Sequence, residues 1–112
     1  MARIELEMQF YAGKWEGNKW PSIDIEPVAS EVFLPLLLFI SGAYGFTPPP
    51  VTDIVEGYTA EFVIREKRVV MLLDNWTFSI ASESEALRND LLNRLLTLPP
   101  TFFDSKKAKG PE

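Results

Sequence analysis

The sequence contains no cysteine and no histidine among its 112 residues. Without cysteine there is no disulfide, no thiolate nucleophile and no thiolate metal ligand. Without histidine as well, most zinc, iron and copper sites and most hydrolytic triads are excluded. We therefore expect no enzyme and no cofactor, although an all-oxygen site for Mg²⁺ or Ca²⁺ remains compatible with the composition. A chain free of cysteine also suits a reducing compartment, so a cytoplasmic location is expected.

Basic residues are missing from a long central part of the chain. Between Trp20 and Ile64 there is no lysine or arginine, and the net charge of the whole chain is −5. The acidic residues of this window are Asp24, Glu26, Glu31, Asp53, Glu56 and Glu61. An acidic surface built from them would speed the encounter with a basic partner and repel nucleic acid. The alternative is that the net charge only keeps the protein soluble, and that the window lacks lysine because half of it is core.

No hydrophobic run is long enough to cross a membrane, because a spanning helix needs about 20 mostly apolar residues. The longest candidate, 32–40, is soon followed by glycines and three prolines. We expect it to be a buried helix with Ser30 as its N-cap and an end at Ser41 and the glycine after it. Because Pro35 suits a first turn, the regular helix would begin near Leu34, or a longer one would bend there. Such an apolar helix needs cover on nearly every side, from a sheet, a second helix or a second subunit.

Alternation of apolar and polar residues predicts a sheet of about five antiparallel strands. The first two are expected at 3–11 and 22–26, joined by a hairpin loop. Residues 58–81 fit a three-stranded meander if Glu66-Lys67 and Asp74-Asn75 form two-residue turns. Both turns then give one apolar face, predicted to be the core side of the sheet: Tyr58, Ala60, Phe62, Ile64, Val69, Met71, Leu73, Trp76, Phe78 and Ile80. The opposite face is mixed, and a partner or only solvent would cover it.

A second helix is expected after the meander. Ser82 and Glu85 have the spacing of a capping box, and Pro99 and the proline after it end the helix. Its apolar stripe consists of Leu87, Leu91, Leu95 and Leu98, widened by Leu92 and Leu96. The order β-β-α-β-β-β-α predicts an α+β domain over 1–103, with two helices packed on one face of the sheet. The polar end, 104–112, is expected to be a flexible tail whose lysines aid solubility.

The candidate site combines acidic and aromatic residues from two segments, 15–26 and 44–56. Tryptophans beside an acidic turn bury a large area with few rotatable bonds, which is typical of binding hot spots. The alternative is that the two tryptophans cap the open end of the core. The predicted partner-binding residues are Trp15, Glu16, Trp20, Asp24, Glu26, Phe46, Asp53 and Glu56.

The leading hypothesis is therefore a non-enzymatic module that binds another protein, for example as an inhibitor of a basic enzyme such as a toxin. Small acidic α+β domains with aromatic loops are common among bacterial inhibitor and immunity proteins, although no family motif is present here. One alternative is a homo-oligomer with 32–40 or the mixed sheet face as its seam. Another is a small-ligand carrier or enzyme with a pocket of buried carboxylates. Neither nucleic acid nor a membrane is expected as a partner.

Overall fold

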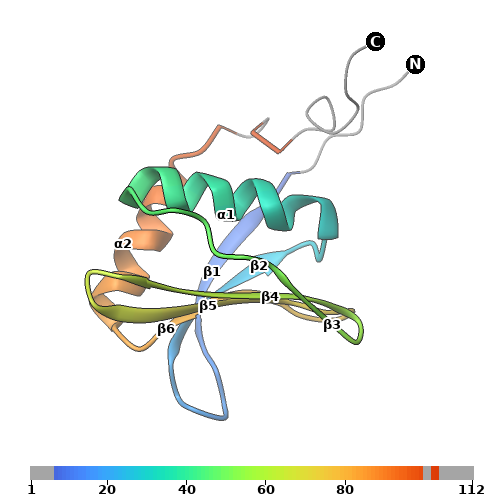
Figure 1. Ribbon diagram of the computed structural model, residues 1–112, viewed down its shortest axis with the longest axis horizontal. Coiled ribbons are helices and arrows are strands. Elements are labelled where there is room, and N and C mark those ends of the chain that lie inside the picture. Colours follow the sequence, from blue (N-terminus) through green and yellow to red (C-terminus); the bar gives the residue numbers. More distant parts are fainter. Residues whose placement is uncertain (1–6, 100–101, 104–112) are drawn as a thin grey trace.

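The protein forms a six-stranded antiparallel sheet with two helices on one face, as a computed structural model of residues 7–99 and 102–103 shows (Figure 1). The strand order across the sheet is β1-β2-β6-β5-β4-β3. The elements are β1 (Gln9–Lys14), β2 (Pro21–Glu26), α1 (Ser30–Tyr44), β3 (Thr52–Ile54), β4 (Gly57–Ile64), β5 (Lys67–Leu73), β6 (Phe78–Ser82) and α2 (Glu85–Leu96). The predicted α+β architecture is confirmed, with one strand more than expected.

The additional strand is β3, which has three residues and pairs with the beginning of β4. So short a segment directly after a run of prolines carries no recognisable alternation, and its formation depends on pairing with β4. The first predicted strand is described from residue 7 onward, so its expected start at residue 3 lies outside the described residues. The same holds for the predicted tail, 104–112.

The meander of β4, β5 and β6 has the predicted core face but not the predicted turns. Ile64 pairs with Lys67, so the first turn is Arg65-Glu66, one residue earlier than expected. Both turn residues have positive φ, 54° and 67°, as a primed two-residue turn requires. The partner of each β4 residue therefore changes by two positions. Because strand side chains alternate with a period of two, such a change leaves the inner face intact.

The loop between β5 and β6 is also longer than predicted. Leu73 pairs with Phe78, which leaves a four-residue loop in place of the expected two-residue turn. Asp74 shapes this loop, because its Oδ1 accepts hydrogen bonds from the backbone N–H of Trp76 at 2.8 Å and of Thr77 at 2.7 Å. The prediction that Trp76 belongs to the core face is wrong, since its side chain is 79% exposed.

Helix α1 is longer at both ends than the sequence suggested. It begins at Ser30 and contains Pro35, and its N-cap position is Ala29, so the predicted Ser30 cap is not formed. It continues past Ser41, whose hydroxyl donates to the carbonyl of Leu38 at 3.0 Å. The helix ends where Gly45 adopts the left-handed conformation with φ of 73°. A glycine tolerates this conformation without steric cost, which explains the end of the helix there.

Helix α2 begins two residues later than the predicted capping box. Ser84 is the N-cap, and its Oγ accepts a hydrogen bond from the Leu87 N–H at 3.2 Å. Ser82 instead accepts from the backbone N–H of Ser84 at 3.1 Å. The predicted widening of the apolar stripe fails at Leu96, which is 58% exposed.

A buried arginine ties α2 to the first hairpin. Arg88 is 9% exposed, and its Nη1 donates to the carbonyls of Gly13 at 3.0 Å and Ser22 at 2.9 Å.

In the described part of the chain, neither helix has the length and apolarity that crossing a membrane requires.

The core lies between the sheet and the two helices. α1 packs above β4 and α2 beside β1, β2 and β6 (Figure 1). From α1 the buried side chains are those of Val32, Phe33, Leu36, Leu37 and Ile40. Leu34 and Leu38 are 51% and 49% exposed, so the expected cover of α1 on nearly every side is not complete within a single chain. Cover by a second subunit, the other expected arrangement, stays a prediction.

Candidate functional site

A pocket lies at the end of the sheet where α1 begins, and we call it the acidic end pocket. Its volume is about 560 Å³. It is formed by the β2–α1 connection, the β3–β4 turn and the β5–β6 loop. Its lining residues are Val28, Ser30, Asp53, Ile54, Glu56, Gly57, Tyr58, Leu73, Asp74 and Asn75.

The position of the β3–β4 turn depends on Gly57. An added Cβ at this residue would lie 1.8 Å from the Leu73 carbonyl oxygen and 2.8 Å from the Asp74 Cα. Only a glycine therefore lets the turn approach the end of β5 so closely. With the turn in this position, Asp53 and Glu56 line the same pocket as Asp74.

A hydrogen bond joins the two acidic loops. Asn75 donates from its side-chain nitrogen to Glu56 Oε1 at 2.7 Å. Asp53 pairs with Tyr58 across β3 and β4, and Tyr58 lies on the inner face of the sheet with its ring 5.8 Å from that of Phe33. These contacts hold the two loops in place beside the pocket.

The acidic end pocket carries negative charge. Three of its lining residues are acidic and, among the residues that the structure describes, none of those lining it is a lysine or an arginine. Most of the lining residues belong to the central window without basic residues, whereas Leu73, Asp74 and Asn75 lie beyond it. Carboxylates in general bind guanidinium and ammonium groups through charge-assisted hydrogen bonds. Within the described ranges, no cluster of three or more potential ligands could hold a metal ion.

Exposed apolar side chains occupy the loops that form the acidic end pocket. Val55 is 98% exposed next to Glu56, and Trp76 is 79% exposed next to Asn75. The hydrogen bond between Asn75 and Glu56 connects these two neighbours. An exposed tryptophan beside charged groups is the composition of a protein-binding hot spot.

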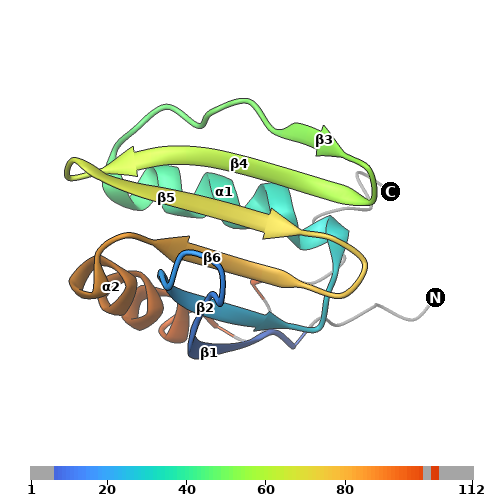
Figure 2. The same cartoon turned by 90° about the horizontal axis from the view of Figure 1, so that it is seen from below.

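The predicted tryptophans lie elsewhere, on the outer face of the sheet, which is the face away from the helices. The β1–β2 hairpin loop projects from that face, and Figure 2 shows it in front of β6. Trp15 donates from Nε1 to Ser79 Oγ at 3.0 Å, and the Arg68 guanidinium lies 5.1 Å from the centre of the Trp20 ring. Ser79 on this face is 1% exposed. The two indoles therefore take part in covering the outer face.

The other predicted site residues are dispersed. Asp24 pairs with Ser79 on the outer face, and Glu26 follows at the end of β2. Three strands, β6, β5 and β4, separate β2 from β3. Phe46 stacks on Phe62 with ring centres 5.1 Å apart and belongs to the rim of the core. Glu16 is exposed in the first hairpin loop.

Of the predicted set, the structure thus brings Asp53 and Glu56 together in one pocket. The sequence reasoning missed Asp74 and Asn75, which it assigned to turn formation alone. A signal was available in the meander, because antiparallel pairing returns the end of β5 to the beginning of β4. Tyr58 pairs with Leu73, so the loop after Leu73 must lie beside the turn before Tyr58.

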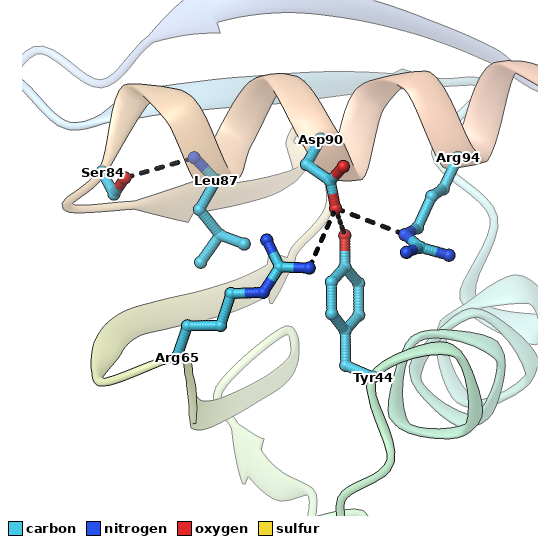
Figure 3. A network of polar contacts seen from close by, with 6 residues as sticks. All are labelled: Tyr44, Arg65, Ser84, Leu87, Asp90 and Arg94. Carbon is cyan, nitrogen blue, oxygen red and sulfur yellow. Dashed lines mark hydrogen bonds and ion pairs between the residues drawn. The ribbon is translucent and has the colours of Figure 1, made fainter.

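A second polar cluster joins the end of α1 to α2 and to the β4–β5 turn (Figure 3). The Tyr44 hydroxyl donates to Asp90 Oδ2, which also accepts from Arg94 Nε at 3.3 Å. Arg65 Nη2 lies 3.9 Å from the same oxygen. Both guanidiniums lie over the Tyr44 ring, at 5.4 Å for Arg65 and 4.7 Å for Arg94. We call these four residues the Asp90 cluster.

The charges of the Asp90 cluster support one another. Burial raises the pKa of Tyr44 to about 12, and the hydrogen bond with Asp90 acts in the same direction. The hydrogen bond from Tyr44, with smaller contributions from Arg94 and Arg65, holds the pKa of Asp90 below its ordinary value. The cluster connects α1, α2 and the β4–β5 turn. It lies at the opposite end of α1 from the acidic end pocket.

No protein-family model matches this chain, and no curated protein and no solved structure is significantly similar to it.

Proposed function

We propose that this protein is a non-enzymatic protein-binding domain that holds a basic segment of its partner in the acidic end pocket. The observation that carries the proposal is the convergence of Asp53, Glu56 and Asp74 on one pocket with no basic residue in its described lining. An acidic pocket of about 560 Å³ has room for one or two long side chains of a partner.

The chemistry of the pocket favours lysine or arginine as the inserted side chain. An arginine would form paired hydrogen bonds with a carboxylate, and Tyr58 and Leu73 would contact its aliphatic part. Val55 and Trp76 on the adjoining loops would supply apolar contact area around the charged centre. The negative field would also raise the association rate at low ionic strength.

The composition supports a binding role over catalysis. With neither histidine nor cysteine in the chain, nothing of the usual kind activates a serine or a water molecule. An inhibitor of a basic enzyme, such as a toxin, is the version of this function that fits the acidic end pocket best. The absence of cysteine agrees with a role in a reducing compartment such as the cytoplasm.

The test is a binding titration with three fluorescent peptides of equal length, one rich in arginine and lysine, one neutral and one acidic. The double variant Asp53→Asn/Glu56→Gln keeps the shape of the pocket and removes two charges. We expect its dissociation constant for the basic peptide to rise at least about tenfold, because each charge-assisted hydrogen bond contributes about 1.5–3 kcal/mol. The salt dependence should also become weaker.

The matched control is Glu16→Gln/Glu61→Gln, which removes the same charge from two exposed residues that do not line the pocket. Its dissociation constant should stay within about twofold of the unmodified protein. If both double variants weaken binding equally, only the net charge matters and the pocket proposal is wrong. Equal binding of the neutral and basic peptides would also contradict it.

A further inference from the structure

The edge of the sheet beside the acidic end pocket is formed by β3. This strand pairs with β4 on one side and, in the part of the chain that the structure describes, no strand lies on its other side (Figure 2). Its three residues, Thr52, Asp53 and Ile54, are all exposed. Asp53 and Ile54 also line the acidic end pocket. The open edge and the pocket therefore belong to the same region of the surface.

The main chain of Asp53 points away from the rest of the sheet. Ile54 pairs with Gly57 across the two-residue turn Val55-Glu56, and such a turn closes on a pair whose backbone groups bond to each other. Hydrogen-bonded and non-hydrogen-bonded pairs alternate along an antiparallel ladder, so the next pair, Asp53 with Tyr58, is of the second kind. The N–H and the carbonyl of Asp53 therefore point outward, and within the described residues no hydrogen bond uses either group.

The side chain of Asp53 lies on the helix side of the sheet. Directly opposed residues of an antiparallel pair share a face, and Tyr58, opposite Asp53, has its ring 5.8 Å from that of Phe33 in α1. The carboxylate of Asp53 is thus on the same side as the start of α1, where Ser30 lines the pocket. A residue of an added strand that paired with Asp53 would place its side chain on this side too, with about 5 Å between the Cβ atoms.

The charge of Asp53 limits which strands could pair with this edge. A short edge strand with a charged residue is a common protection against unwanted strand pairing. An acidic residue opposite Asp53 would be repelled, and a large apolar one would cover the carboxylate without giving it a partner. A lysine or an arginine would form a cross-strand ion pair with Asp53, and Glu56 and Asp74 line the same pocket. The edge is therefore complementary to a basic strand.

We propose that the partner's basic segment binds as an extended strand, antiparallel to β3, with a lysine or an arginine opposite Asp53. The main chain of that basic residue donates to the Asp53 carbonyl and accepts from the Asp53 N–H, while its side chain enters the acidic end pocket. In strand addition of this kind, backbone hydrogen bonds supply affinity and alternate side chains supply specificity. This binding mode rests on the proposed function and adds to it the conformation of the bound segment and the place of its basic residue.

The test uses a short fluorescent peptide with one central arginine flanked by threonine and valine, and two forms of it that are methylated on one backbone nitrogen. Methylation of the arginine nitrogen removes the donor to the Asp53 carbonyl, so the dissociation constant should rise at least about tenfold. Methylation of the next residue is the matched control, because its N–H points away from β3 in the added strand. It should change the dissociation constant by less than about threefold.

Hydrogen exchange of the ¹⁵N-labelled protein, free and saturated with the unmethylated peptide, gives a second readout. The Asp53 amide should exchange at least about tenfold more slowly in the complex, because it gains a main-chain acceptor. The Ala12 amide is the control, since Ala12 belongs to β1 at the opposite edge of the sheet. Its exchange rate should change by less than about twofold.

The results separate strand addition from the proposed function on which it rests. If the arginine peptide binds and both methylated forms bind as well as it does, or are weakened equally, the pocket holds a basic side chain without strand addition, and only the present proposal is wrong. An unchanged exchange rate of the Asp53 amide in the saturated complex also overturns strand addition alone. If neither this peptide nor the peptide rich in arginine and lysine binds, both proposals are wrong.

Discussion

Replacing Gly57 by alanine should destabilise the protein and disrupt the acidic end pocket. The added Cβ would lie 1.8 Å from the Leu73 carbonyl oxygen and 2.7 Å from its carbonyl carbon. Ordinary contacts begin near 3.4 Å, so the two backbones would have to separate by about 1.6 Å. Both atoms belong to the backbone of a paired strand and cannot turn aside as a side chain would. We expect a loss of about 3 kcal/mol in the free energy of unfolding, at the upper end of the range for overpacking.

Urea unfolding followed by tryptophan fluorescence measures this loss. Gly17→Ala is the control, because an added Cβ at Gly17 meets nothing within 4 Å and this glycine does not have a positive φ. It should change the free energy of unfolding by less than about 0.5 kcal/mol. In the absence of urea, the Gly57→Ala variant should also bind the basic peptide more weakly, because the β3–β4 turn is displaced. A Gly57→Ala protein as stable as the Gly17→Ala control would refute the close approach of this turn to β5.

Four further changes have defined expectations. Gly42→Ala should stabilise the protein by about 0.5–1 kcal/mol, because alanine is the better helix former and its methyl group has open space. Arg88→Leu should cost about 3 kcal/mol, because two backbone carbonyls of the first hairpin lose their donor. Trp15→Phe should cost about 1 kcal/mol, because a buried serine hydroxyl loses its indole partner. Urea unfolding measures the change in the free energy of unfolding for each of these three variants. Asp90 has a lowered pKa, so its contribution is present above its unfolded value of 3.8 and is lost as the pH falls through the folded pKa. The stability difference between the unmodified protein and Asp90→Asn should therefore be largest near neutral pH and shrink below about pH 4, and a constant difference from pH 7 to 3 would contradict this assignment.

Most of the sheet was predictable because its faces depend on a period of two. The true turn at Arg65-Glu66 changed the partner of every β4 residue, yet Phe62 and Ile64 stayed on the inner face. The prediction that Trp76 lies on the core face failed because of the loop before β6. There Asp74 accepts hydrogen bonds from two backbone N–H groups, and the turn is two residues longer than expected. From the sequence alone, an aspartate at position 74 is compatible with a two-residue turn and with a four-residue loop.

The helix ends were less predictable than the helices. Ser82 and Ser84 both have hydroxyls suitable for capping, and the choice between them depends on how far β6 remains paired. Similarly, Ser41 was expected to mark the end of α1, but its hydroxyl donates to the carbonyl of Leu38 within the same helix. Local sequence offers several equivalent signals in such places, and tertiary packing selects one.

The candidate site was half predictable. The window without basic residues between Trp20 and Ile64 contains Asp53 and Glu56, and these two residues do share a pocket. Asp24 was expected beside them, but it lies on the other face of the sheet with three strands between β2 and β3. The order of strands in the sheet decides which acidic residues meet. That order places β6 between β2 and β5, which alternation along the chain does not reveal.

The most direct test of the acidic end pocket as the binding surface is a titration of the ¹⁵N-labelled protein with the arginine- and lysine-rich peptide, followed by backbone amide chemical shifts. We predict that the shift changes concentrate in residues 53–58 and 73–77, with the Trp76 indole N–H among the largest. Changes confined to the first hairpin loop and the outer face around Trp15 and Trp20, or no saturable change at all, would contradict it.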